Sequence, residues 1–173
     1  MLKVIYYPSQ YFDEAALAQA FDKAKAYLSA TPVGKKTIEV VESAKEQVNL
    51  HVTTERDSTF QHPPGSTAFD AYWNPDIRLQ LTSGQVQSPS VALIHELGHA
   101  RQCIEKLAWY EERSDGSRYL EIEDDNVATH EKPVAAARGE PTRDQYQAFR
   151  GTQPFVGRRY ANLTLVDKVI LFG

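Results

Sequence analysis

One short stretch, residues 90–102 with the sequence SVALIHELGHARQ, restricts the fold more than any other part of the chain. It places His95 and His99 four residues apart and puts Glu96 directly after the first histidine. Apolar residues precede the histidines and no proline interrupts them, so the pattern predicts a helix over residues 90–110. Residues i and i+4 of a helix share a face, and the two imidazoles are therefore expected to point the same way.

The residue types in this stretch are those of a catalytic zinc site. Neutral imidazole is a good zinc ligand, so His95 and His99 can hold one ion together. Glu96 lies about 100° around the helix, where it can reach a water on the metal without being a ligand. A zinc-bound water has its pKa lowered to about 7, and it becomes a nucleophile when Glu96 takes its proton. This is the HExxH arrangement of metalloproteases, and it predicts Zn²⁺ as the cofactor.

The residues around the motif agree with a helix. Ser88 or Ser90 can cap its N-terminus, and Pro89 is tolerated in the first helical turn. Gly98 costs about 1 kcal/mol relative to alanine inside a helix. Its presence therefore predicts tight packing or the close approach of another segment at this point.

A third metal ligand is needed, because catalytic zinc usually has three protein ligands and a water. The longer HExxHxxGxxH pattern is absent, since Gln102 and Glu105 stand at its glycine and last histidine positions. Glu105 would lie about 80° from the direction of His95 on a continuous helix, which makes it a poor ligand. Spacing leaves the downstream candidates open: Glu121, Glu123, Asp124, Asp125, His130, Glu131 and Glu140.

The rest of the chain predicts an α+β fold with a small sheet packed beside the motif helix. Three-and-four periodicity predicts a helix at 13–30, and a second helix is expected at 35–47. Pro133 at a first-turn position, with Gly139 and Pro141 at the end, predicts a short helix at 133–138. Alternation predicts strands at 2–7, 48–55, 68–74 and 77–82, the last two forming a hairpin. Loops are expected at 56–67, 83–90 and 111–131, and the apolar tail 160–173 is expected to dock on the core.

Length and composition favour one domain over residues 1–173. A net charge of −4 argues against nucleic acid and anionic membranes as partners. No apolar run is long enough to span a membrane, and the N-terminus lacks the apolar region of an export signal. The single cysteine, Cys103, excludes an internal disulfide and is expected to be a small buried thiol. We therefore expect a cytoplasmic protein, or one delivered by a route that is independent of a signal peptide.

Two segments together carry a family resemblance: SPSVALIHELGHA, residues 88–100, and THEKPVAAARGEPTRDQY, residues 129–146. They resemble the effector-type zinc metallopeptidases. That family includes type III secretion effectors that cleave host signalling kinases, and toxin domains fused to type VI secretion spike proteins. In the family the second segment reads Thr-Glu-Asn, then a short helix, then Gly-x-Pro-x-Arg-x-x-Tyr.

The resemblance implies roles for individual residues. Counted from Glu131, the glycine, proline, arginine and tyrosine of the family segment fall on Gly139, Pro141, Arg143 and Tyr146. Glu131 is thereby implied as the third zinc ligand, with Arg143 and Tyr146 near the site. The chain departs from the family at two neighbouring positions, since Lys132 replaces an asparagine and His130 precedes the glutamate. His130 is therefore the alternative third ligand, with Glu131 beside it.

Peptide hydrolysis also needs a donor for the oxyanion of the tetrahedral intermediate. Tyr146, Arg143, Tyr160 and Arg118 are the candidates. The alternative for Tyr146 is packing on the core, and for Arg143 an ion pair with Asp144 or Glu140.

The expected function is that of a zinc-dependent endopeptidase with a zincin-like fold and a protein or peptide substrate. By resemblance, the setting is a bacterial effector or toxin carried into a target cell, with a carrier protein of the secretion apparatus as a further partner. Two rivals remain: a catalytically silent zinc or protein-binding module, and a zinc amidase that acts on cell wall. The intact Glu96 argues against the silent module, because a purely structural site would use a fourth protein ligand.

Overall fold

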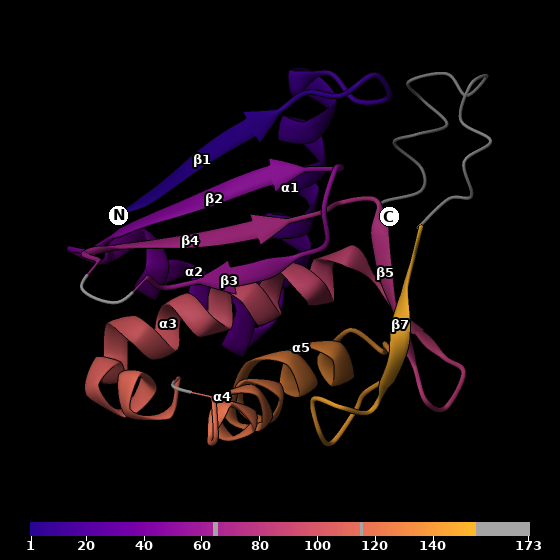
Figure 1. The fold of residues 1–173 in the computed structure, drawn as a ribbon. Coiled ribbons are helices and arrows are strands. Elements are labelled where there is room, and N and C mark those ends of the chain that lie inside the picture. The colour runs from indigo at the N-terminus through magenta and orange to yellow at the C-terminus, as the bar shows by residue number, and fades with distance from the viewer. Residues whose placement is uncertain (64–65, 115, 155–173) are drawn as a thin grey trace.

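The computed structural model describes residues 1–63, 66–114 and 116–154. Its larger sheet has four strands, shown in Figure 1. In spatial order these are β1 (Leu2–Tyr7), β2 (Gln47–Thr53), β4 (Ala68–Trp73) and β3 (Thr59–Gln61). β1, β2 and β4 run parallel, and β3 lies antiparallel to β4 at the edge of the sheet.

Two helices connect β1 to β2 and lie behind the sheet in Figure 1. α1 (Glu14–Ser29) begins at Asp13, whose side chain accepts a hydrogen bond of 2.7 Å from the backbone N–H of Ala16. α2 (Pro32–Ser43) is capped in the same way by Thr31. Adjacent parallel strands need such a crossover connection, so the two helices follow from the order of the first two strands.

The core lies between this sheet and the helices. Its strand residues are Val48, Leu50, Val52, Phe69, Ala71 and Trp73, all less than 3 % exposed. Trp73 also links β4 to the start of the motif helix, because its indole N–H donates to the carbonyl of Pro89 at 2.7 Å. Core packing is therefore the role of this tryptophan, and it fixes the N-terminal end of the helix that carries the histidines.

A second, antiparallel sheet stands beside the first and contradicts the predicted hairpin of 68–74 with 77–82. Its order is β6-β5-β7, with β5 at Ile77–Leu81, β6 at Val86–Gln87 and β7 at Phe149–Pro154. The hairpin prediction was wrong because β4 already has β2 on one side and β3 on the other. With both edges of β4 occupied, β5 pairs with β6 and β7 instead.

Helices make up most of the described chain after β6. α3 (Pro89–Arg113) is capped by Ser88 and has one residue, Lys106, outside helical geometry. It is followed by α4 (Tyr119–Asn126), a π-helical turn η1 (Val127–Glu131) and α5 (Lys132–Ala137). In Figure 1 these last elements lie beneath α3, on its far side from the sheet.

The predicted loop at 111–131 was therefore mostly wrong. Its polar composition hid buried positions that support a helix: Ile122, Glu123, Asn126 and Val127 are at most 1 % exposed. The loop predicted at 56–67 also contains the short strand β3.

The α+β class is confirmed, and the strand at 2–7 agrees residue for residue. The helices at 13–30, 35–47, 90–110 and 133–138 and the strand at 48–55 are present with shifted ends. The tail 160–173, including Tyr160, lies outside the described residues. Among the described helices, none has both the length and the apolar character needed to span a membrane.

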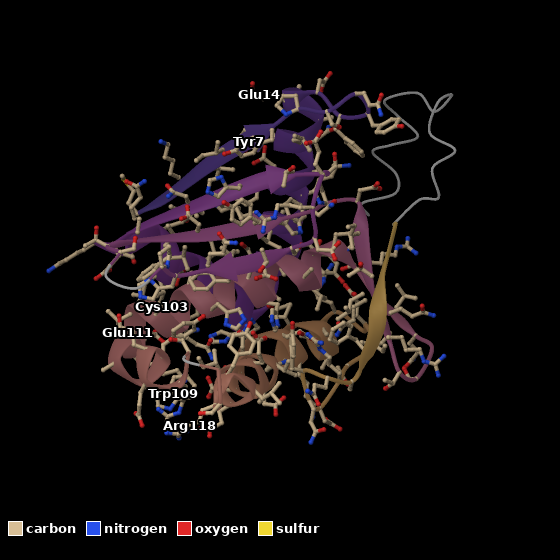
Figure 2. All side chains as sticks on the ribbon, viewed as in Figure 1. Tyr7, Glu14, Cys103, Trp109, Glu111 and Arg118 are labelled. Atoms are coloured by element: carbon tan, nitrogen blue, oxygen red, sulfur yellow. The ribbon has the colours of Figure 1, made fainter. Side chains whose placement is uncertain are left out.

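Cys103 is buried on α3, as expected (Figure 2). Burial raises the pKa of its thiol well above the usual value.

Candidate metal centre

The motif helix is held firmly on the side that faces the core. Leu93, Ile94 and Leu97 are each at most 1 % exposed and belong to the apolar cluster that includes the sheet. This packing fixes the direction in which His95 and His99 project. Both histidines are themselves buried, at 6 % and 3 % exposure.

Gly98 lies where the segment containing α4 and η1 comes closest to α3. A Cβ atom at this position would lie 2.1 Å from Oδ1 of Asn126 and 3.0 Å from Cγ of His130. The close contact allows Nδ2 of Asn126 to donate to the carbonyl of His95 at 2.8 Å. The expected close approach at Gly98 is thereby confirmed, and it brings the second helical segment against the histidines.

Three ligand-type atoms meet beside this contact. Nε2 of His95 and Nε2 of His99 lie 3.2 Å apart. Oε2 of Glu123 lies 3.0 Å from the His95 nitrogen and 3.3 Å from the His99 nitrogen. Bonds of about 2.0–2.1 Å at tetrahedral angles separate two zinc ligands by about 3.3 Å. The triangle of atoms therefore has the size that a tetrahedral metal requires, and the three residues form a group that could hold a metal ion.

The other nitrogen of each imidazole has an acceptor. Nδ1 of His95 donates to Oε2 of Glu131 at 2.9 Å, and Nδ1 of His99 donates to Oε1 of Gln102 at 3.0 Å. The amide nitrogen of Gln102 is directed to other acceptors, so its oxygen faces the histidine. With a proton on each Nδ1, both Nε2 atoms are directed toward Glu123, and loss of the proton from Nε2 of His95 would leave two ligand lone pairs there. A cation at the centre of the triangle would satisfy all three atoms.

The remaining third-ligand candidates have other partners. Glu121 pairs with Arg113 and Arg118, Asp124 accepts from the backbone of Tyr146, and Asp125 accepts from Lys106 and Gln102. Glu140 accepts from Ser88 and Tyr27. His130 packs against Gly98, and its Nδ1 lies 2.9 Å from the hydroxyl of Thr129. Of the downstream candidates, Glu123 is the one that joins His95 and His99 in the triangle of ligand atoms.

Glu131 lies near the triangle of ligand atoms but on the opposite side of the His95 ring, so its carboxylate is not part of the triangle. Its carboxylate contacts Nδ1, whereas Glu123 contacts Nε2. The guanidinium of Arg143 donates to both carboxylate oxygens of Glu131, from Nε at 2.7 Å and from Nη2 at 2.5 Å. The group of atoms that could hold a metal ion therefore contains Glu123, whereas Glu131 contacts the opposite nitrogen of His95. Arg143 pairs with Glu131 and not with the expected Asp144 or Glu140.

Burial and hydrogen bonding pull the ionisable groups of the site in different directions. Burial raises the pKa of Glu96 to about 8, and the nearby Glu123 adds to this while His95 opposes it. Burial alone would lower the pKa of His95, but its hydrogen bonds with Glu123 and Glu131 outweigh burial and raise the pKa to about 10. Burial alone would raise the pKa of Glu123, but its contacts with His95 and His99 outweigh burial and lower it. Burial alone would likewise raise the pKa of Glu131, but its hydrogen bonds with His95 and Arg143 lower the pKa to about 2. Both carboxylates that contact His95 are therefore held ionised, which suits cation binding.

A pocket of about 190 Å³ opens beside the triangle. It is lined by all the predicted site residues, namely His95, Glu96, His99, Glu131, Arg143 and Tyr146, and by Glu123. Phe60 of β3 forms part of one wall, and its ring stacks on His99 with centroids 5.6 Å apart. Ile77 and Leu79 of β5 contribute apolar surface. The motif histidines therefore stand in a pocket with walls from both sheets.

The expected oxyanion donors lie in different places. The ring of Tyr146 stacks on His95 at a centroid distance of 5.7 Å, so this tyrosine borders the site. Burial raises the pKa of its hydroxyl to about 12, which keeps the hydroxyl protonated and able to donate. Arg118 pairs with Glu112 and Glu121 on the surface, away from the pocket. Tyr160 lies outside the described residues.

Two functional candidates were not singled out from the sequence. Gln102 was noted only as a departure from a longer motif, yet it fixes the tautomer of His99. Tyr119 lines the pocket one helical turn before Glu123. The pairing of Tyr119 with Glu123 at i and i+4 on a helix was the available signal, but it required recognising residues 119–126 as helical.

Comparison with known proteins adds no assignment: the chain matches no protein-family model, no curated protein and no solved structure.

Proposed function

We propose that this protein is a zinc-dependent endopeptidase with a zincin-like arrangement of helix and edge strand. The single observation that carries the proposal is the triangle formed by Nε2 of His95, Nε2 of His99 and Oε2 of Glu123, with edges of 3.0, 3.2 and 3.3 Å. Two imidazoles and one carboxylate are the ligand set of a common class of catalytic zinc site, in which the fourth position stays open.

The neighbouring residues support zinc over other metals. Two histidines and a carboxylate also bind non-haem iron, but iron oxygenases do not need a general base beside the metal. Glu96 lines the pocket next to both histidines and is 6 % exposed. It makes none of the ligand contacts of the triangle. A carboxylate in that place fits hydrolysis.

The chain's own residues can then carry a hydrolytic cycle. A bound zinc ion would supply Lewis acidity, acidifying a water and polarising the scissile carbonyl. Glu96 accepts a proton from the attacking water and passes it to the nitrogen of the leaving amine as the C–N bond breaks. Tyr146, with its protonated hydroxyl beside His95, is placed to donate to the oxyanion. Arg143 is less suited to that role, because its guanidinium is bonded to Glu131.

The architecture around the pocket supports an extended polypeptide as substrate. β3 is the last strand of its sheet and pairs with β4 on one side, and among the described residues no strand pairs with its other edge, which lies next to the pocket. An extended peptide can add to such an edge through main-chain hydrogen bonds. We take the resemblance of residues 88–146 to effector-type metallopeptidases as support for a proteolytic effector or toxin delivered into another cell.

The test compares the wild-type protein with Glu96→Gln, which keeps the shape of the side chain and removes the base. We expect both proteins to bind one zinc ion, and we expect cleavage to fall by roughly 10²- to 10⁴-fold in the variant. New protein N-termini in a target-cell extract report the cleavage, and purified cell wall serves as the parallel substrate. New amines in the cell wall alone would support the amidase alternative. Full biological effect from the metal-bound variant would support a silent binding module.

A further inference from the structure

We propose that Glu131 is a positioning residue for His95. Its carboxylate fixes the tautomer and the orientation of the imidazole, and Arg143 holds the carboxylate in place. The inference rests on the proposed metal site and deepens it, because it concerns residues outside the triangle of ligand atoms. It assigns a role to the Glu131–Arg143 ion pair that differs from both metal ligation and oxyanion binding.

The contacts of His95 leave its ring one usable ligand atom. Nδ1 faces the carboxylate of Glu131 at 2.9 Å, and an ionised carboxylate accepts hydrogen bonds only. The proton on Nδ1 is therefore fixed, and Nε2 is directed to the triangle. Tyr146 stacks on the ring face with an interplanar angle of 22°, and Asn126 holds the backbone carbonyl of His95. Ring packing sets the plane of the imidazole, and Glu131 determines which ring nitrogen faces away from the triangle.

Glu131 is held more firmly than its contact with one histidine requires. Arg143 donates to both carboxylate oxygens in a bidentate pair, and Nε2 of Gln87 donates to Oε1 at 3.1 Å. The charged side chains of Glu131 and Arg143 are only 1 % and 3 % exposed. Bidentate arginine–carboxylate pairs combine strength with a fixed geometry. Glu131 ends η1, Arg143 lies in the segment before β7, and Gln87 belongs to β6. These contacts therefore join separate parts of the fold.

His99 provides an internal comparison within the same site. Its Nδ1 donates to the neutral amide oxygen of Gln102, whereas Nδ1 of His95 donates to a charged carboxylate. A carboxylate acceptor raises the basicity of the imidazole more than an amide does. His95 is therefore expected to be the stronger of the two nitrogen ligands, and removal of the Glu131 charge should weaken it selectively.

Four proteins test the role: wild type, Glu131→Gln, Arg143→Gln and the double variant. Zinc affinity is measured by chelator competition, and the visible absorption spectrum is recorded with Co²⁺ in place of zinc. We expect Glu131→Gln to lower zinc affinity roughly 10- to 100-fold and to shift the Co²⁺ spectrum. If Arg143 acts only by holding Glu131, adding Arg143→Gln to the first variant should cause no further loss of affinity.

Glu140→Gln is the matched control. Glu140 also accepts charge-assisted hydrogen bonds, from Ser88 and Tyr27, but it contacts no histidine. Removal of its charge should weaken hydrogen bonds that hold the start of α3 and leave both zinc affinity and the Co²⁺ spectrum unchanged. A shift in this control equal to that of Glu131→Gln would mean that general destabilisation explains the effect, and the proposed role would be lost.

Further outcomes separate this inference from the metal site itself. Unchanged affinity and spectrum in Glu131→Gln, with zinc bound by the wild type, would overturn the positioning role and leave the metal site standing. A wild type that binds no zinc would overturn both. If Glu131→Gln does not fold, proton NMR of the zinc-loaded wild type decides. We expect the imidazole N–H proton of His95 on Nδ1 and further downfield than that of His99; a proton on Nε2 would contradict the role.

Discussion

Glu123 and Glu131 contact the same imidazole through its two different nitrogens. This difference separates the proposed metal ligand, Glu123, from Glu131, the residue proposed to orient the ring. Only the oxygen of Glu123 that contacts Nε2 of His95 also lies close to His99, at 3.3 Å. The family-based assignment chose Glu131 because that residue falls in a recognisable segment. The two glutamates lie eight positions apart along a helical stretch, so both can reach one histidine from opposite sides.

We predict that Glu123→Ala loses zinc far more completely than Glu131→Ala. The first substitution removes one of three ligands, and the second removes a hydrogen bond to one of them. Chelator competition at matched protein concentrations measures both affinities. Tight zinc binding by Glu123→Ala together with its loss in Glu131→Ala would return Glu131 to the third ligand position.

Gly98→Ala tests the contact that brings the ligand-bearing segments together. Alanine normally favours a helix over glycine by about 1 kcal/mol. Here we expect it to destabilise the protein by roughly 1–3 kcal/mol, because its Cβ would meet Oδ1 of Asn126 at 2.1 Å. Urea unfolding measures the change. Combining it with Asn126→Ala should cost less than the sum of the two single variants, and strict additivity would show that the contact is not the cause.

The larger sheet carries a chain of side-chain hydrogen bonds across three strands. Tyr7 of β1 bonds Nδ1 of His51 on β2, and Nε2 of His51 bonds Asp70 on β4, each at 2.9 Å. Asn49 also donates to Asp70. Partial burial alone would raise the pKa of Asp70, but its hydrogen bonds with His51 and Asn49 outweigh burial and lower the pKa. His51 is therefore part of a structural network and not a metal ligand.

A lowered carboxyl pKa fixes the direction of a pH effect on stability. The contribution of Asp70 is present above the ordinary carboxyl pKa of about 4 and is lost as the pH falls through its lower folded value. We expect Asp70→Asn to lower the free energy of unfolding by roughly 1 kcal/mol at neutral pH, since the site is partly exposed. The difference from wild type should shrink as the pH falls below 4. A difference that is constant from pH 7 to pH 3 would contradict this account.

The elements that sequence patterns predicted best are those whose residues alternate or repeat without interruption. α1 shows apolar residues at three- and four-residue spacing, and the motif helix has a clear cap at Ser88. β3 was missed because three residues are too few for a period. α4 and η1 were missed because their buried positions include the polar residues Glu123, Asn126 and Glu131. These side chains make hydrogen bonds around His95 and add nothing to a hydrophobic pattern. A helix whose buried face carries polar residues shows no clear hydrophobic periodicity, so the sequence pattern does not predict it.

The candidate site was predictable to the extent that it lies on one helix. His95, Glu96 and His99 are local, and their spacing specifies their common face. The position of the proposed third ligand, Glu123, depends on where α4 crosses α3, and the contact at Gly98 and the π-helical turn after α4 both lie at this crossing. π-Turns are rare and frequently accompany functional sites. Neither feature can be read from ligand spacing along the chain.

At the scale of the whole molecule, the proposed metal joins α3 to α4 through side chains alone. A ligand that binds only the folded state stabilises it, by about 4 kcal/mol when its free concentration is 1,000 times its Kd. We therefore predict that chelation of zinc lowers the melting temperature of the wild type. The melting temperature of His99→Ala, which lacks a ligand, should respond little to either zinc or chelator. An equal response in both proteins would place the metal elsewhere.

The most direct measurement of the central claim is anomalous diffraction from crystals of the zinc-loaded protein, collected on both sides of the zinc absorption edge. We predict one strong peak about 2.0–2.2 Å from Nε2 of His95, Nε2 of His99 and a carboxylate oxygen of Glu123, with Glu131 still bonded to Nδ1 of His95. A peak coordinated by Glu131, or the absence of any peak between the two histidines, would contradict the account.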